Sequence, residues 1–147
     1  MNIAIIAARG GSSRIKKKNI KPFRGKPIIY YSIKAAINSK CFDRIIVSTD
    51  DKKIAQIAKN YGAEVPFLRT KKLAKNSVSN REVIVDVLKR LNLKKIPDYV
   101  CQIFATAPFL RPTDLNNSLK ILKSNKSAEF CFSVVKFPHP IQRAMKI

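Results

Sequence analysis

The chain has 147 residues and a hydrophobic content of 46%, which fits one folded domain with a sizeable core rather than a disordered basic tail. It carries 30 Lys and Arg residues against 9 Asp and Glu residues, a formal net charge of +21. Such a charge attracts anions, but a general abundance of lysine explains much of the excess, so charge alone does not indicate nucleic-acid binding.

Composition also bears on where the protein is located. No apolar run approaches the ~20 residues of a membrane span, and we expect no secretory leader and no membrane partner. The cysteines at 41, 101 and 131 have no CxxC spacing. Cys101 and Cys131 lie in apolar runs, which predicts buried packing and a reducing, cytoplasmic location.

The first predicted element is a short buried strand at residues 3–7, and the loop after it contains the pair Gly10 and Gly11. Glycine permits φ > 0 and lets backbone N–H groups come close to an anion. The positive charge comes from five nearby residues, Arg9, Arg14, Lys16, Lys17 and Lys18. This combination predicts a polyphosphate-binding loop, and a solvated basic loop after an edge strand is the alternative.

A helix, a strand and a second helix follow. Residues 27–38 predict a helix with a proline in its first turn, and residues 44–48 predict a short strand. Ser48 or Thr49 can cap the next helix, which Gly62 ends. This helix buries one apolar face, formed by Ile54, Ile57, Ala58 and Tyr61.

The middle of the chain combines a weak strand, a polar loop and a capped helix. Residues 64–67 predict an edge strand because they include a proline, which cannot donate to a sheet. A polar loop covers residues 69–80, and the sequence from Ser79 to Glu82 is a capping box. The helix that begins there buries an apolar face, formed by Val83, Ile84, Val87, Leu88 and Leu91.

The last third predicts a strand at residues 99–104, a structured loop at 105–112, a helix at 113–122 and a strand at 130–135. Residues 137–147 look like the start of a further element. Strands that alternate with helices of about ten residues predict βαβ units. The chain is therefore expected to be a single α/β domain, residues 1–147, with a mostly parallel sheet.

Ligands of open α/β sheets bind beyond the carboxyl ends of the strands, so the loops at residues 8–26, 68–80 and 105–112 should converge. They contribute mostly cations and hydrogen-bond donors: Arg9, Lys18, Asn19, Arg69, Ser79, Asn80 and Thr106. A set poor in carboxylates, with His139 outside it, suits phosphoryl or nucleotidyl transfer. The chain has no GxxxxGK(S/T) or GxGxxG motif, which argues against a P-loop NTPase and a dinucleotide dehydrogenase.

Four blocks of sequence occur in the same order as in one known family: residues 8–12 with Ile15, Lys18 and Asn19, then residues 42–50, 61–69 and 105–114. Through these blocks essentially the whole chain resembles the acylneuraminate cytidylyltransferases, the CMP-sugar synthetases of acidic eight- and nine-carbon sugars. Within that family, residues 105–109 and 137–141 are most similar to the enzymes for pseudaminic acid.

The resemblance implies a fold, a reaction and partners. The fold is a three-layer, Rossmann-like α/β fold of the nucleotide-diphospho-sugar-transferase type. The reaction joins CTP and an acidic nonulosonic sugar into a CMP-sugar and pyrophosphate, with Mg²⁺ bridging the triphosphate. Full-length relatives are expected to be homodimers.

The resemblance also assigns roles to individual residues. Arg9 and Lys18 are the catalytic residues, because they would neutralise charge on the leaving pyrophosphate. The nucleotide contacts are Ala8, Gly10, Gly11, Ser12, Asn19, Arg69, Asn80, Phe104 and Thr106. Phe104 replaces a glutamine that reads the base in the sialic and legionaminic acid enzymes, so it either stacks or merely packs there. No residue is assigned as a metal ligand.

The chain departs from the family pattern at several positions. Ala7, Ser13 and Lys16 stand where the family has Pro, Lys and Pro, which loosens the loop and removes one phosphate-facing cation. Val78 stands where the family has a hydroxyl contact to the nucleotide. The chain is also shorter than family members, which implies a truncated synthetase without the sugar-binding and dimerisation part.

Three alternatives stay open. The sugar could be sialic, legionaminic or a keto-deoxy sugar acid. The chain could be a non-catalytic remnant that folds and pairs with a partner. It could also be a basic nucleic-acid-binding domain, but its aromatic residues mostly lie in or beside apolar runs rather than on an exposed basic surface.

Overall fold

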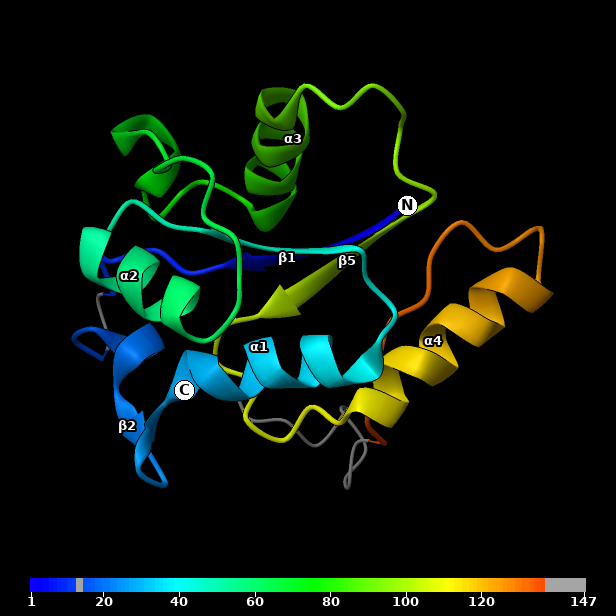
Figure 1. Cartoon of the computed structure of the whole chain (residues 1–147), viewed down its shortest axis with the longest axis horizontal. Helices are drawn as coiled ribbons and strands as arrows, with labels where there is room; N and C mark the ends of the chain where they lie inside the picture. The colour runs from blue at the N-terminus through cyan, green and yellow to red at the C-terminus, as the bar shows by residue number, and fades with distance from the viewer. Residues whose placement is uncertain (13–14, 137–147) are drawn as a thin grey trace, which may run out of the picture.

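Three parallel strands form the centre of the molecule (Figure 1). β1 (Asn2–Ala7) lies between β4 (Arg44–Ser48) and β5 (Tyr99–Phe104), and both neighbours pair with it in parallel. The computed structural model describes residues 1–12 and 15–136, so Ser13, Arg14, His139 and the predicted further element at 137–147 lie outside the described residues.

Helices cover both faces of this sheet (Figure 1). One face packs against α1 (Ile28–Ser39), α2 (Lys52–Asn60) and α4 (Pro112–Ser124), and the other face packs against α3 (Asn80–Leu91). Alternation along β1 supplies both cores, with Ala4 and Ile6 on the first face and Ile3 and Ile5 on the second. The predicted three-layer α/β fold with a parallel sheet is confirmed.

Local capping explains where the two central helices begin. The expected box at α3 is present, because the Ser79 hydroxyl accepts the N–H of Glu82 and the Glu82 carboxylate accepts the N–H of Ser79, at 3.3 and 2.8 Å. At α2 the prediction of Ser48 or Thr49 as cap is wrong. Asp51 caps this helix, and its carboxylate accepts the backbone N–H groups of Lys53 and Ile54.

Two predicted strands are absent from the sheets of the described residues. Only one bridge, Ile46 to Glu64, remains of the strand expected at 64–67. The segment 130–135 forms no strand, and Phe130 and Phe132 are 72% and 70% exposed. Apolar character predicted these strands, but a strand also needs a neighbour to accept its backbone hydrogen bonds.

Short elements that the sequence pattern missed connect the larger ones. A hairpin, β2 (Pro22–Phe23) with β3 (Lys26–Pro27), turns through Arg24 and Gly25 at φ 44° and 78°. Two 3-10 helices, η1 (Lys18–Ile20) and η2 (Lys71–Ala74), lie in the loops expected to be irregular. No helix in the described part of the chain is long and apolar enough to cross a membrane.

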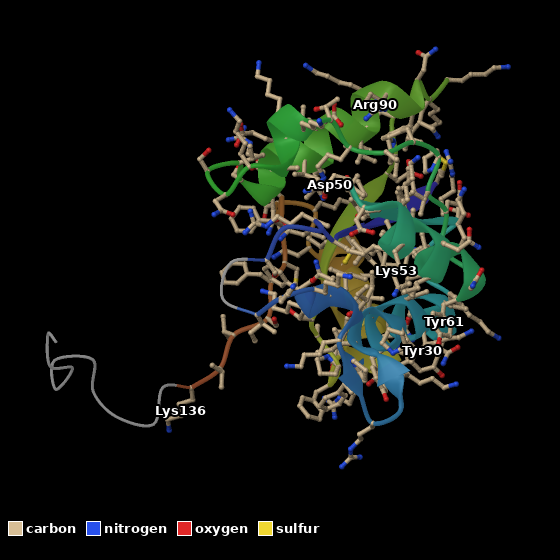
Figure 2. All side chains as sticks on the ribbon, turned by 90° about the vertical axis from the view of Figure 1, so that its left-hand side faces the viewer. Tyr30, Asp50, Lys53, Tyr61, Arg90 and Lys136 are labelled. Carbon is tan, nitrogen blue, oxygen red and sulfur yellow. The ribbon has the colours of Figure 1, made fainter. Side chains whose placement is uncertain are left out.

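The predicted burial of two cysteines is only partly met. Cys101 is half-buried, and burial raises the pKa of its thiol to about 11. Cys131 is also half-buried and lies in the segment that forms no strand. Tyr30 and Tyr61 pack edge to face with ring centroids 4.8 Å apart and join α1 to the end of α2 (Figure 2).

Candidate functional site

The carboxyl ends of the three strands lie in register. Ala7 of β1 pairs with Ser48 of β4 on one side and with Phe104 of β5 on the other. The loops that follow these strands therefore leave the same edge of the sheet, where α/β proteins bind ligands. This arrangement confirms the expected convergence of the loops after residues 7 and 104.

The first of these loops, residues 8–12, is held by backbone hydrogen bonds to the neighbouring loop. The N–H of Ala8 donates to the Ser48 carbonyl, and the N–H of Gly10 donates to Oδ1 of Asp50, both at 2.9 Å. Figure 2 places Asp50 between α3 and α2. The Ala8 N–H is thus occupied within the chain, and the contact of Ala8 with the nucleotide stays a prediction.

Gly10 is required for close approach rather than for a left-handed backbone. A Cβ at this position would lie 2.9 Å from the Asp51 Cβ, closer than real contacts allow. The described glycines with positive φ are Gly25 and Gly62, not Gly10 or Gly11, so the expectation of φ > 0 in this loop is wrong. A Cβ at Gly11 would meet nothing within 4 Å.

Arg9 is fixed at both its backbone and its side chain. Its carbonyl accepts a hydrogen bond of 2.8 Å from the side-chain amide of buried Asn19, and its guanidinium donates to the side-chain oxygen of Asn76. Asn19 therefore positions Arg9, and its contact with the nucleotide stays a prediction. Lys18, at the start of η1, is exposed.

Arg69 is an anchor beneath the site. It is only 7% exposed, and its guanidinium donates to the hydroxyl and the carbonyl of Ser48, at 3.1 and 2.6 Å. Its own N–H donates to the Thr49 carbonyl at 2.7 Å. Burial lowers the pKa of Arg69 from its ordinary value, Asp50 opposes this, and the positive charge of Arg9 adds a smaller lowering.

The remaining predicted contacts lie farther along the edge. Phe104 is 61% exposed at the end of β5, and its carbonyl accepts the Ser32 hydroxyl at 2.8 Å. Its ring is therefore free to stack rather than packed in the core. Thr106 is half-buried in the next loop, and Asn80 is the first residue of α3. Among the described residues, no hydrogen bond joins either of them to residues 8–12.

A hollow of about 470 Å³ opens beside the glycine pair. Its lining comes from two loops: Gly11, Ser12, Ala74, Lys75 and Asn76. This volume is in the range of small-molecule sites. The loop after β1 and the loop after Arg69 thus form two walls, as the convergence of loops predicted.

Sequence reasoning missed Asp50 and Asn76, which hold this edge together. Both carboxylates of the pair Asp50 and Asp51 follow directly after a predicted strand, so the rule that selected the other loops would have selected them too. The expectation of an edge poor in carboxylates was wrong at this point. The described residues hold no group of three or more His, Cys, Asp or Glu side chains placed to bind a metal ion.

A comparison with protein-family models decides the family. The model described as "Cytidylyltransferase" matches residues 3–146. The chain belongs to the cytidylyltransferase family.

The relatives that the chain matches carry names that refer to different acidic sugars. The chain is 43% identical over 144 residues to the "Pseudaminic acid cytidylyltransferase" of Campylobacter jejuni. This alignment covers 97% of this chain and 62% of that protein. The chain is 38% identical over 122 residues to the "CMP-N,N'-diacetyllegionaminic acid synthase" of Legionella pneumophila. This alignment covers 82% of this chain and 53% of that protein. The chain thus spans about three fifths of its curated relative from Campylobacter.

Among solved structures, the fold is similar to that of a CMP:2-keto-3-deoxy-manno-octonic acid synthetase complexed with CTP. The TM-score is 0.72 at 22% identity, over 86% of this chain and 48% of that chain. At this identity the similarity establishes the nucleotidyltransferase fold alone.

Proposed function

We propose that this cytidylyltransferase chain forms the CTP-binding part of a CMP-sugar synthetase for an acidic nonulosonic sugar, with pseudaminic acid as the first candidate. The 43% identity to the Campylobacter enzyme favours that sugar. The 38% identity to the legionaminic acid synthase makes legionaminic acid the second candidate. The proposal extends to the whole reaction only together with the part of the relatives that the chain does not span.

In the proposed reaction, the anomeric hydroxyl oxygen of the sugar attacks the α-phosphorus of CTP. The bond from that phosphorus to the bridging oxygen breaks, pyrophosphate leaves, and the hydroxyl proton is released. Charge develops on the leaving pyrophosphate, so catalysis depends on positioning and on cations near the phosphates. Arg9 and Lys18 take that role, and Gly11 and Ser12 offer backbone and hydroxyl donors.

The observation that carries the proposal is the fixed geometry of Arg9. Asn19 holds its carbonyl and Asn76 accepts from its guanidinium, so the charge lies between the glycine pair and the loop after Arg69. A side chain fixed before the ligand arrives loses less conformational entropy on binding. Phe104, exposed at the other end of the edge, would stack on the cytosine.

Mg²⁺ is the proposed companion of CTP. Mg²⁺ is usually coordinated by one or two protein carboxylates together with phosphate oxygens and water, rather than by protein ligands alone. Asp50 fits this mode, because its Oδ1 accepts the Gly10 N–H and so places the carboxylate against the glycine pair. When bound, the ion would neutralise charge on the triphosphate.

Two further parts of the proposal rest on the family resemblance. A homodimer is expected for a full-length protein of this type. The three free cysteines support a reducing, cytoplasmic location. Both stay predictions.

Calorimetric titration with CTP and Mg²⁺ tests the proposal. We expect binding to the chain, and a loss of about 10- to 100-fold in affinity for Arg9→Ala, because a charge-assisted contact is removed. Lys120→Ala on exposed α4 is the matched control and should leave affinity unchanged. Absence of heat at millimolar CTP would contradict the proposal. Pyrophosphate release with pseudaminic or legionaminic acid then identifies the sugar.

A further inference from the structure

The hollow beside the glycine pair has one wall that the site residues above do not explain. Gly11 and Ser12 form the first wall, and residues 74–76 form the second. The second wall belongs to the loop that the sequence marked only as polar. Its one ionic side chain is Lys75.

The backbone that carries Lys75 is fixed from both ends. At one end, buried Arg69 ties the loop to Ser48 of β4. At the other, Asn76 accepts a hydrogen bond from the Arg9 guanidinium. Between them, η2 ends at Ala74, and the next residue is Lys75, whose carbonyl accepts the Val78 N–H at 3.3 Å.

Neither cation beside the hollow, Lys75 or Arg9, forms a salt bridge with a carboxylate of the described residues. Neighbouring Lys72 differs, because it lines another hollow together with Glu82 and Asp86. Two cations that form no ion pair, beside the backbone of Gly11 and the hydroxyl of Ser12, attract a polyanion.

We propose that Lys75 is a further polyphosphate-binding cation of this site, in addition to Arg9 and Lys18, and that it acts in the hollow which it lines together with Gly11 and Ser12. The inference rests on the proposed function in its ligand, the triphosphate of CTP, but the chemistry that Lys75 would recognise is the chain of phosphates itself. It assigns to the loop after Arg69 a cation for the phosphates, in addition to the cations of the loop after β1.

The test compares three probes on four proteins: inorganic tripolyphosphate, CTP and cytidine, titrated into the wild-type chain, Lys75→Gln, Lys75→Arg and Lys71→Gln. Lys71 is the matched control, because it is an exposed lysine of the same loop, at the start of η2, and lies outside the lining of the hollow. Lys75→Gln should weaken tripolyphosphate and CTP by about 5- to 30-fold and leave cytidine unchanged. Lys75→Arg should keep most of the affinity, and Lys71→Gln should change it less than about twofold.

The outcomes separate this inference from the proposed function. Equal losses in Lys75→Gln and Lys71→Gln would overturn it, because they would reflect general positive charge. Tripolyphosphate binding that depends on Lys75, without binding of CTP, would support the inference and contradict the proposed function. If Lys75→Gln leaves CTP binding intact, the proposed function is supported and this inference is contradicted. Unchanged thermal unfolding of the variants excludes loss of fold as the cause.

Discussion

The two ends of the carboxyl edge are built differently. On the side of β4, Ser48, Thr49 and Arg69 are buried and joined by hydrogen bonds, and the glycine loop rests on them. On the side of β5, Phe104 is 61% exposed. Under the proposed function, the phosphates of CTP would lie on the hydrogen-bonded side of β4 and the base on the exposed side of β5.

The same asymmetry runs through the sheet below. α3 covers Ile3 and Ile5 of β1 and Ile46 of β4, all of which are fully buried. In register beside Ile3, Val100 of β5 is 38% exposed on that face. Apolar strands of similar sequence are therefore buried or exposed on this face according to whether α3 covers them.

Removing Arg69, the anchor on the β4 side of the edge, should have the largest effect on the free energy of unfolding. Arg69→Met removes the guanidinium donor to the hydroxyl of buried Ser48 and one of the two donors to its carbonyl, which keeps the N–H of Ala8. We expect a loss of about 2–4 kcal/mol in the free energy of unfolding. Arg90→Met is the control, since Arg90 donates to the Leu68 carbonyl and lies 3.7 Å from the Phe67 ring at a partly exposed place. It should cost about 0.5–1 kcal/mol. Denaturant unfolding measures both, and equal losses would contradict the difference between a buried and an exposed anchor.

The close approach at the glycine loop gives the next effect. Gly10→Ala places a Cβ 2.9 Å from the Asp51 Cβ and should cost about 1–3 kcal/mol and weaken CTP binding. Gly11→Ala meets nothing within 4 Å and should change stability by less than about 0.5 kcal/mol. Thermal unfolding of the two variants decides whether contact or general flexibility makes the glycine necessary. A similar loss in both would argue for flexibility.

On the β5 side of the edge, a substitution should change the affinity for CTP and leave the free energy of unfolding unchanged. Phe104→Ala is expected to weaken CTP by about 5- to 30-fold, because base stacking on an aromatic ring is lost. Tripolyphosphate affinity and unfolding should stay as in the wild type, because the ring is mostly exposed. Phe104→Tyr should preserve binding, and Phe109→Ala, at a ring that is 80% exposed, serves as the control. Loss of tripolyphosphate binding in Phe104→Ala would contradict a division into base and phosphate sides.

The smallest effect is expected at the exposed end of the loop after Arg69, where the capping box begins α3. Ser79→Ala should cost about 1 kcal/mol. The hydrogen bond from the Ser79 hydroxyl, and then that from its N–H, lower the pKa of Glu82 below its ordinary 4.5. The stabilisation by ionised Glu82 is therefore present above pH 4.5 and is lost as the pH falls through the lower pKa of the folded state. Unfolding of Glu82→Gln should accordingly be less pH-dependent than that of the wild type in this range, and an unchanged pH profile would contradict the role of the carboxylate.

Much of the fold was predictable because the signals are local. β1, α1, β4, α3 and β5 were expected within a few residues of their observed bounds, from apolar periodicity and from the capping box at Ser79. The strand at 130–135 was wrong, since its apolar side chains find no partner strand among the described residues. The local sequence pattern indicates which element a segment can form. For a strand, a neighbouring strand must also be present to pair with it.

By itself, the sequence determined the order of strands and helices, the glycine loop after β1 and the family to which the chain belongs. The tertiary structure alone decided the places of the polar residues: Asn19 holds Arg9, Arg69 holds Ser48, Asp50 holds Gly10, and Lys75 lines a hollow together with Gly11. Periodicity and caps act over a few residues, so they can be read along the chain. A hydrogen bond between loops that are tens of residues apart depends on the register of the sheet, and only the folded chain fixes that register.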